Sequence, residues 1–169
     1  TANGRHRTQT TGNWPKIWKN IIPNQGVFFD GQVFDAYELA SKIIRSAKKR
    51  IILIENYIDE STLTHLSKKT KSVKVLLFTK KITRQLTLDV KKANEQYGHF
   101  EVKPFHKSPD HFLIVDGQEV YHLGASLKDL GRNWFAFSKM DKSSVKSLLH
   151  EIVLSHTWNS HLKPFPYIS

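Results

Sequence analysis

Side chains that could hold a phosphate lie in two short polar segments of the sequence. His106, Lys107 and His111 lie in or beside the first, and Ser126 and Lys128 lie in the second, the small-residue loop GASLKDLG. Imidazole, ammonium and hydroxyl groups are donors that suit a phosphate anion, and an imidazole can also serve in acid–base or nucleophilic chemistry. Plainer interpretations stay open. His106 and Lys107 could be solvated loop residues, His111 could be a half-buried strand histidine, and Ser126 could simply end a strand.

The residue types also exclude several kinds of chemistry. Cysteine is absent, which rules out a cysteine nucleophile, a thiolate zinc site and a redox motif, and fits a reducing, cytoplasmic location. The nine histidines lack metal-ligand spacing, since His150 and Glu151 stand six and five residues before His156 instead of following the i, i+4 pattern. We therefore expect neither a metal nor another cofactor, and the sequence identifies no small-molecule substrate.

Positive charge is concentrated in one part of the chain. The sequence has 26 Lys and Arg against 15 Asp and Glu, a formal net charge of +11, and nine of the basic residues lie between Lys68 and Lys92, where only Asp89 opposes them. Such a field attracts polyanions, so nucleic acid is the expected partner, with Lys80, Lys81 and Arg84 as candidate contacts. The same cluster could instead be the solvated faces of two helices.

Alternating strand and helix patterns position these side chains. Apolar runs such as 51–54 are typical of strands covered on both faces, and the helix expected over 33–49 would turn Phe34, Tyr37, Ile44 and Ala47 inward. The order favours an α/β/α sandwich with a mixed, largely parallel sheet, whose ligands gather where its strands end. The expected strands are 27–29, 50–54, 72–79 and 99–105, and the expected helices are 33–49, 61–69 and 83–97.

A different pattern follows in the second half. Two strand-like runs meet at Asp116-Gly117, a strong signal for a β-hairpin, then come a last strand over 134–137 and a helix that Asp141 would cap. We expect an amino-terminal arm (1–26), one domain (27–155) and an irregular tail (156–169). The longest apolar runs have four residues, far short of the roughly 18 that a membrane span requires, and no signal-peptide pattern is present.

From about Gly26 to Met140 the chain resembles the phospholipase D-like superfamily. The segments SPDHFLIVD, VYHLGASLKDLG and WFAFSKM are similar to a bacterial subgroup with the motif S-H-D-R-F-L-I-I-D, which is often attached to phage- or mobile-element-type DNA-binding regulators. The resemblance implies an H-x-K-x4-D site, in which the histidine attacks a phosphodiester, the lysine or arginine clamps the phosphate and the aspartate orients the histidine. It also implies a homodimer, because two copies of the motif complete one site.

The sequence departs from that motif at its most important position. Pro109 stands where the nucleophile belongs, His111 stands at the lysine or arginine position, and Asp116 matches the aspartate. Ser126 and Lys128 lie roughly where the superfamily has its phosphate-binding serine and asparagine. The resemblance therefore indicates a phosphate pocket whose catalytic site is degraded.

Three functions follow from these observations. The first is a module that binds nucleic acid or another phosphodiester without cleaving it. The second is a working metal-independent phosphodiesterase or nuclease in which His106 or His111 has replaced the missing nucleophile. The third is a structural dimerisation domain of a DNA-binding regulator.

Overall fold

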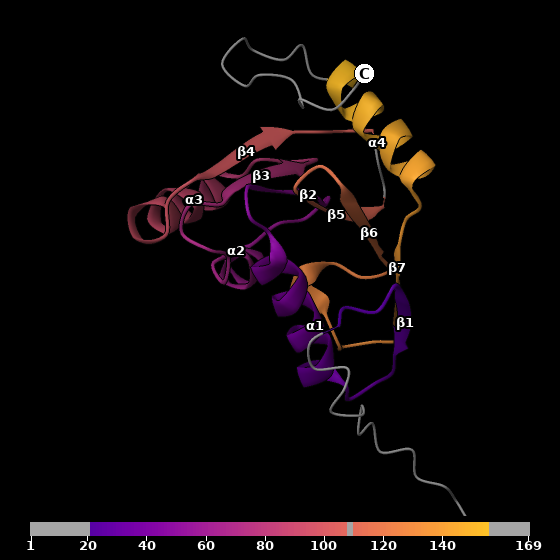
Figure 1. Cartoon of the computed structure of the whole chain (residues 1–169). Helices are drawn as coiled ribbons and strands as arrows, with labels where there is room; N and C mark the ends of the chain where they lie inside the picture. The colour runs from indigo at the N-terminus through magenta and orange to yellow at the C-terminus, as the bar shows by residue number, and fades with distance from the viewer. Residues whose placement is uncertain (1–20, 108–109, 156–169) are drawn as a thin grey trace, which may run out of the picture.

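Seven strands form one sheet with helices on both faces in the computed structural model, which describes residues 21–107 and 110–155 (Figure 1). The elements lie close to the expected ranges. The strands are β1 (Gln25–Phe28), β2 (Arg50–Ile54), β3 (Lys74–Thr79), β4 (Phe100–Pro104), β5 (His111–Val115), β6 (Glu119–Leu123) and β7 (Phe135–Lys139). The α-helices are α1 (Val33–Ser46), α2 (Glu60–Leu66), α3 (Arg84–Gln96) and α4 (Lys142–Ser155), with a 3₁₀ turn, η2, at Leu127–Asp129.

The strand order is β1-β7-β6-β5-β2-β3-β4. Only β2–β3 and β3–β4 pair in parallel, whereas the other four pairs are antiparallel. The α/β class is confirmed, but the prediction of a largely parallel sheet is wrong. Parallel neighbours need a long crossover, and only α2 and α3 connect neighbouring strands in this way. The links from β4 to β5 and from β5 to β6 are short, so the chain reverses direction there.

Two apolar cores lie on opposite faces of the sheet. Helices α1, α2 and α3 cover one face and α4 covers the other (Figure 1). Strand β2 contributes to both cores, since Ile51 and Leu53 face the three helices while Ile52 and Ile54 pack toward α4. This double burial explains the continuous apolar run in the sequence.

Helix α1 buries a face different from the one expected at its amino-terminal end. Phe34 and Tyr37 are 72% and 38% exposed, whereas Ala36, Leu39 and Ile43 are buried. Phe34 and Ala36 are separated by about 200° around a helix, so burial of the alanine turns the phenylalanine to solvent. The prediction of an inward Phe34 and Tyr37 was wrong, while that for Ile44 and Ala47 is confirmed.

Asp116 joins the hairpin turn to the start of β2. The backbone N–H groups of Lys48, Lys49 and Arg50 donate to its carboxylate at 3.0, 2.8 and 2.9 Å. Asp116 and Gly117 both have positive φ, 53° and 68°, as a type I′ hairpin turn requires. The side chain therefore lies at the opposite end of β5 from His111, roughly 17 Å away at 3.4 Å per residue. It is a structural anchor here and is not placed to orient a histidine of the motif.

We predict that Asp116→Ala lowers the free energy of unfolding at pH 7 by about 1–2 kcal/mol, because three exposed or part-buried backbone N–H groups lose a charged acceptor. Burial alone would raise the pKa of this carboxyl, but the backbone hydrogen bonds outweigh it and hold the pKa below its ordinary 3.8. The stabilisation is complete above the unfolded pKa and is lost as pH falls through the folded pKa.

Urea unfolding of the wild type and Asp116→Ala at pH 7 and at pH 3 measures this dependence. Asp116→Asn is the control, because asparagine also tolerates positive φ, so it separates the lost charge from backbone strain. A difference between wild type and Asp116→Ala that does not shrink at low pH would contradict a charged anchor.

Candidate phosphate-binding site

The antiparallel pairing of β5 with β2 places His111 where β2 ends. Ile54 pairs with Phe112, and one further step in register sets Glu55 opposite His111. Directly opposed residues share a face of the sheet, here the face on which Leu53 and Leu113 join the core beneath α1–α3. We call this end of the sheet the candidate edge, and it comprises residues 55–59, 79–81, 105–107, 110–111 and 123–129.

Glu55 is a buried acid at the centre of the candidate edge. It is only 1% exposed, and its Oε1 accepts a hydrogen bond from the backbone N–H of Leu127 at 3.1 Å. Burial raises the pKa of Glu55 to about 8, although the nearby Ser126 hydroxyl and the N–H of Leu127 oppose the rise. The carboxyl is therefore mostly protonated and neutral at pH 7.

Glu55 was not among the site residues expected from the sequence. A carboxylate directly after an apolar strand was a usable signal, because this position falls where ligands gather in such a sheet. Its burial, however, depends on a loop 72 residues further along the chain, which no local pattern reveals.

The loop that covers Glu55 is held by close backbone packing. Gly124 donates its N–H to the carbonyl of Ala136 at 2.8 Å, and a Cβ at this glycine would lie 2.8 Å from the same oxygen, so only glycine fits. Ser126 precedes η2 and donates through Oγ to Asp129 at 3.1 Å. The half-buried Lys128 places its Nζ 5.9 Å from the ring centre of Tyr57. Ser126 and Lys128 flank Leu127, whose N–H binds Glu55, so both lie near that carboxyl.

His111 is half-buried at the same place. Its Nδ1 is buried and has no hydrogen-bond partner among the described residues. Burial lowers the pKa of His111, and the charge of nearby His122 adds to this, while Asp110 and Asp129 act in the opposite direction. The imidazole is therefore neutral at pH 7 and carries a single N–H.

The other expected residues are spread along the candidate edge. His106, Lys107, Lys80, Lys81 and Arg84 are all exposed. His106 and Lys107 follow β4, three strands from β5, so they stand roughly 14 Å from His111 at 4.8 Å per strand. Pro109 lies outside the described residues. The structure thus brings together His111, Ser126 and Lys128, with the remaining cations to one side.

The basic cluster between Lys68 and Lys92 is not one continuous patch. Lys69 is buried, and Lys68 lies 3.0 Å from the ring centre of Tyr37 and donates to Ser41. Lys74 begins β3, at the opposite end of the strand from Lys80. The field at the candidate edge therefore comes from only part of the cluster.

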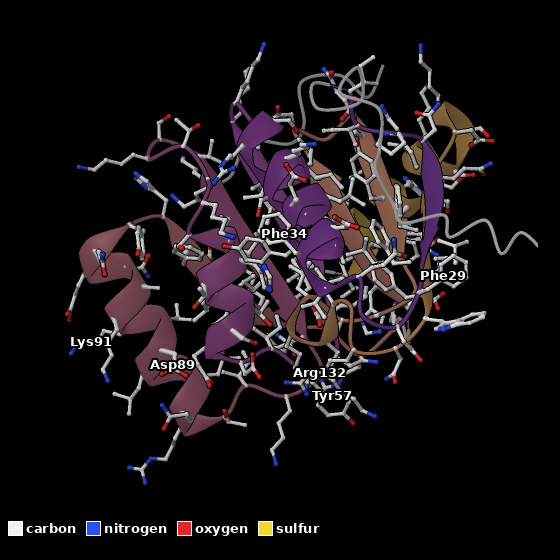
Figure 2. The ribbon with its side chains drawn as sticks, turned by 90° about the horizontal axis from the view of Figure 1, so that it is seen from below. Phe29, Phe34, Tyr57, Asp89, Lys91 and Arg132 are labelled. Atoms are coloured by element: carbon white, nitrogen blue, oxygen red, sulfur yellow. The ribbon has the colours of Figure 1, made fainter. Side chains whose placement is uncertain are left out.

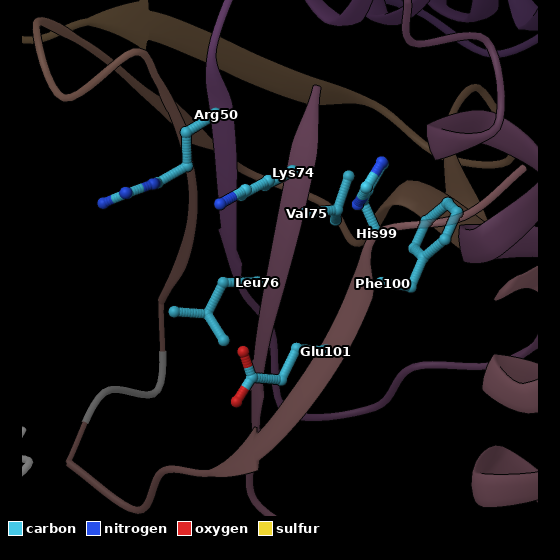
Figure 3. A pocket seen from close by; sticks show the side chains of 7 residues that line it. All are labelled: Arg50, Lys74, Val75, Leu76, His99, Phe100 and Glu101. Atoms are coloured by element: carbon cyan, nitrogen blue, oxygen red, sulfur yellow. The ribbon is translucent and has the colours of Figure 1, made fainter. Parts of the chain in front are cut away.

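A groove of about 260 Å³ lies at the other end of β2 and β3 (Figure 3). Arg50 and Lys74 are register partners there, and their side chains extend to the same side. The lining residues are Arg50, Lys74, Val75, Leu76, His99, Phe100 and Glu101. The groove is separate from Glu55 and His111. Within residues 21–107 and 110–155, no three His, Asp or Glu side chains are placed to hold a metal ion, and no helix is long and apolar enough to cross a membrane.

Comparison with known proteins gives a likeness of fold. By sequence, no protein family and no curated protein matches the chain. Its structure is similar to NucT from Helicobacter pylori, with a TM-score of 0.57 and 15% identity over 78% of this chain and 96% of NucT. It is also similar to TrmBL2, an archaeal chromatin protein described as showing a novel mode of DNA binding, with a TM-score of 0.52 and 15% identity. That match covers 78% of this chain but only about half, 51%, of TrmBL2.

We predict that Glu55→Gln stabilises the protein increasingly as pH rises. The folded protein keeps the Glu55 proton up to about pH 8, whereas the unfolded chain loses it above 4.5. The stability of the wild type relative to the variant therefore decreases as pH rises from 4.5 to about 8, by at most about 1.4 kcal/mol per pH unit. Above pH 8 it is constant.

Urea unfolding at pH 5 and pH 8 tests this prediction. We expect the two proteins to be similar at pH 5 and the variant to be more stable by a few kcal/mol, on the order of 3, at pH 8. An equal difference at both pH values would show that Glu55 ionises normally.

Proposed function

We propose that this chain is a phospholipase D-like module that binds the phosphodiester backbone of nucleic acid without cleaving it. The observation that carries the proposal is the grouping of His111, Ser126 and Lys128 around the neutral, buried Glu55 at the candidate edge. The likeness in fold to NucT and to the DNA-binding TrmBL2 supports the same class of partner.

The neutrality of Glu55 matters for an anion. An ionised carboxylate about 6 Å from a phosphate would repel it by about 3 kcal/mol at an effective dielectric constant of 20. Burial removes that repulsion at neutral pH, so the positive charge of Lys128 remains unopposed by Glu55. Lys80, Lys81 and Lys107 extend the positive field along the candidate edge, which suits a polymer better than a single phosphate group.

Cleavage lacks its expected nucleophile. Proline carries no nucleophilic atom in its side chain, and Pro109 occupies the motif position. The competing phosphodiesterase function requires another imidazole, and the buried, unpartnered Nδ1 of His111 is the observation that favours it. Binding and cleavage are therefore measured on the same preparation.

Affinity for a fluorescent oligonucleotide should fall steeply with salt, because bound lysines release counterions from the backbone. We predict that Lys128→Glu weakens binding about 5- to 20-fold and lowers the salt slope by about 1. Lys91→Glu makes the same charge change on α3, where Lys91 projects away from the loop (Figure 2), and should weaken binding less than twofold. Equal losses in both variants, or affinity that is independent of salt, would refute a site at the candidate edge.

The same proteins are incubated with DNA and with bis-p-nitrophenyl phosphate in EDTA. A module that only binds gives no turnover. Turnover that disappears in His111→Ala or His106→Ala would identify the protein as a phosphodiesterase instead.

The homodimer expected from the resemblance has a candidate surface. Phe34, Phe29 and Trp134 are 72%, 47% and 67% exposed, and the rings of Phe29 and Trp134 meet edge to face at 4.7 Å. Exposed apolar groups of this kind often mark protein interfaces. Phe135 and Phe137, in contrast, are buried in the core.

We predict that the wild type sediments as a dimer at micromolar concentration and that Phe34→Glu shifts it to the monomer. Leu88→Glu, an exposed site on α3, should leave the dimer intact. A wild type that stays monomeric at every concentration would exclude the dimer, and dimerisation without affinity for DNA would favour a purely structural role.

A further inference from the structure

Two buried polar atoms at the candidate edge lack hydrogen-bond partners among the described residues. They are Oε2 of Glu55 and Nδ1 of His111. A buried polar atom without a partner is costly and calls for an explanation. Glu55 directly follows β2 and His111 begins the neighbouring β5, and continuing the register of Ile54 with Phe112 by one residue places the two opposite each other. They then lie on the same face of the sheet as Leu53 and Leu113.

We propose that Glu55 and His111 form a proton-sharing pair beneath the phosphate, in which Oε2–H of Glu55 donates to Nδ1 of His111 and thereby directs Nε2–H of His111 to the phosphodiester. The inference deepens the proposed function and rests on it for the identity of the ligand. It makes Glu55 a positioning residue, which acts on the phosphate through His111.

The geometry permits this contact with small movements. Opposed residues of an antiparallel pair have Cβ atoms about 4.5–5.5 Å apart, so rotation of the side chains is enough to bring the two atoms together. Oε1 can remain on the N–H of Leu127, at 3.1 Å, while Oε2 turns to His111. Each buried atom then gains a partner and the loop keeps its attachment to β2.

The contact decides which nitrogen of His111 carries the proton. A neutral imidazole has one N–H, and when Nδ1 accepts a hydrogen bond the proton resides on Nε2. Loss of the Glu55 proton to solvent reverses the arrangement, because Nδ1 must then donate to the carboxylate and Nε2 keeps only a lone pair. The phosphate loses one donor and meets one additional negative charge, so it is bound in the protonated state and released in the deprotonated one.

Several charged groups surround the pair. Asp59 and Lys128 act on Glu55, together with the nearby Ser126 hydroxyl and the N–H of Leu127. Asp110, Asp129 and His122 act on His111, and His122 also contacts Asp110 at 3.7 Å. Burial is the largest influence on both members, since it raises the pKa of Glu55 to about 8 and lowers that of His111. The change of state is therefore expected near pH 8.

The test is ¹⁵N NMR of the histidine side chains in the full chain between pH 6.5 and 9.5. His122→Gln is used as the background, so that the neighbouring imidazole does not contribute. We expect His111 to carry its proton on Nε2 at pH 6.5 and on Nδ1 at pH 9.5, with a midpoint near 8. In Glu55→Gln the proton should stay on Nε2 throughout, because the amide donates to Nδ1 and does not ionise.

Binding supplies the second readout, with a dinucleotide as the phosphodiester probe. Wild-type affinity should fall by up to about tenfold between pH 7 and 9, the change in the protonated fraction of a group with a pKa of about 8, whereas affinity in Glu55→Gln should change less than twofold. Parallel pH profiles in the two proteins, or a proton on Nδ1 of His111 at pH 6.5, would overturn the pair. Because the tautomer is measured without ligand, absence of probe binding alongside the expected tautomer change would refute the proposed function and leave the pair standing.

Discussion

The burial of one carboxyl group, that of Glu55, is the constraint on which the candidate site depends. A strand of apolar side chains ends in an acid that the loop after β6 covers, and the acid holds this loop through the N–H of Leu127 at 3.1 Å. Without water to stabilise its charge, the carboxyl stays protonated. The loop brings Ser126 and Lys128 to the place where β5 presents His111, so the positions of three potential phosphate donors follow from this one buried contact.

Most of the elements could be predicted from the sequence, because their signals are local. The apolar run of β2, the Asp116-Gly117 turn and the Asp141 cap each act within a few residues, and each is present. The placement of β5 beside β2 could not be predicted, since pairing between distant strands leaves no mark in either segment. A largely parallel sheet was expected for this reason. In the structure only α2 and α3 connect neighbouring strands by helical crossovers.

The grouping at the candidate edge was expected in part. His111, Ser126 and Lys128 were candidates from their residue types and from the resemblance, and the structure places them at one end of the sheet, while their role in binding a phosphate stays a proposal. Glu55 was missed because its character comes from a covering loop that is distant in sequence. Asp116 matched a motif position, yet its carboxylate stabilises the start of β2 at the far end of the strand. The match to the motif therefore predicted that an aspartate would end this strand, but it did not predict what Asp116 does there.

The central claim is that a phosphodiester binds over Glu55, and a crystal structure with a dinucleotide at pH 6.5 tests it most directly. The account predicts a phosphate within hydrogen-bond distance of Nε2 of His111 and of Nζ of Lys128, with the Glu55 carboxyl beneath the imidazole. A phosphate held instead in the groove of Arg50 and Lys74, with His111 and Lys128 unoccupied, would contradict it.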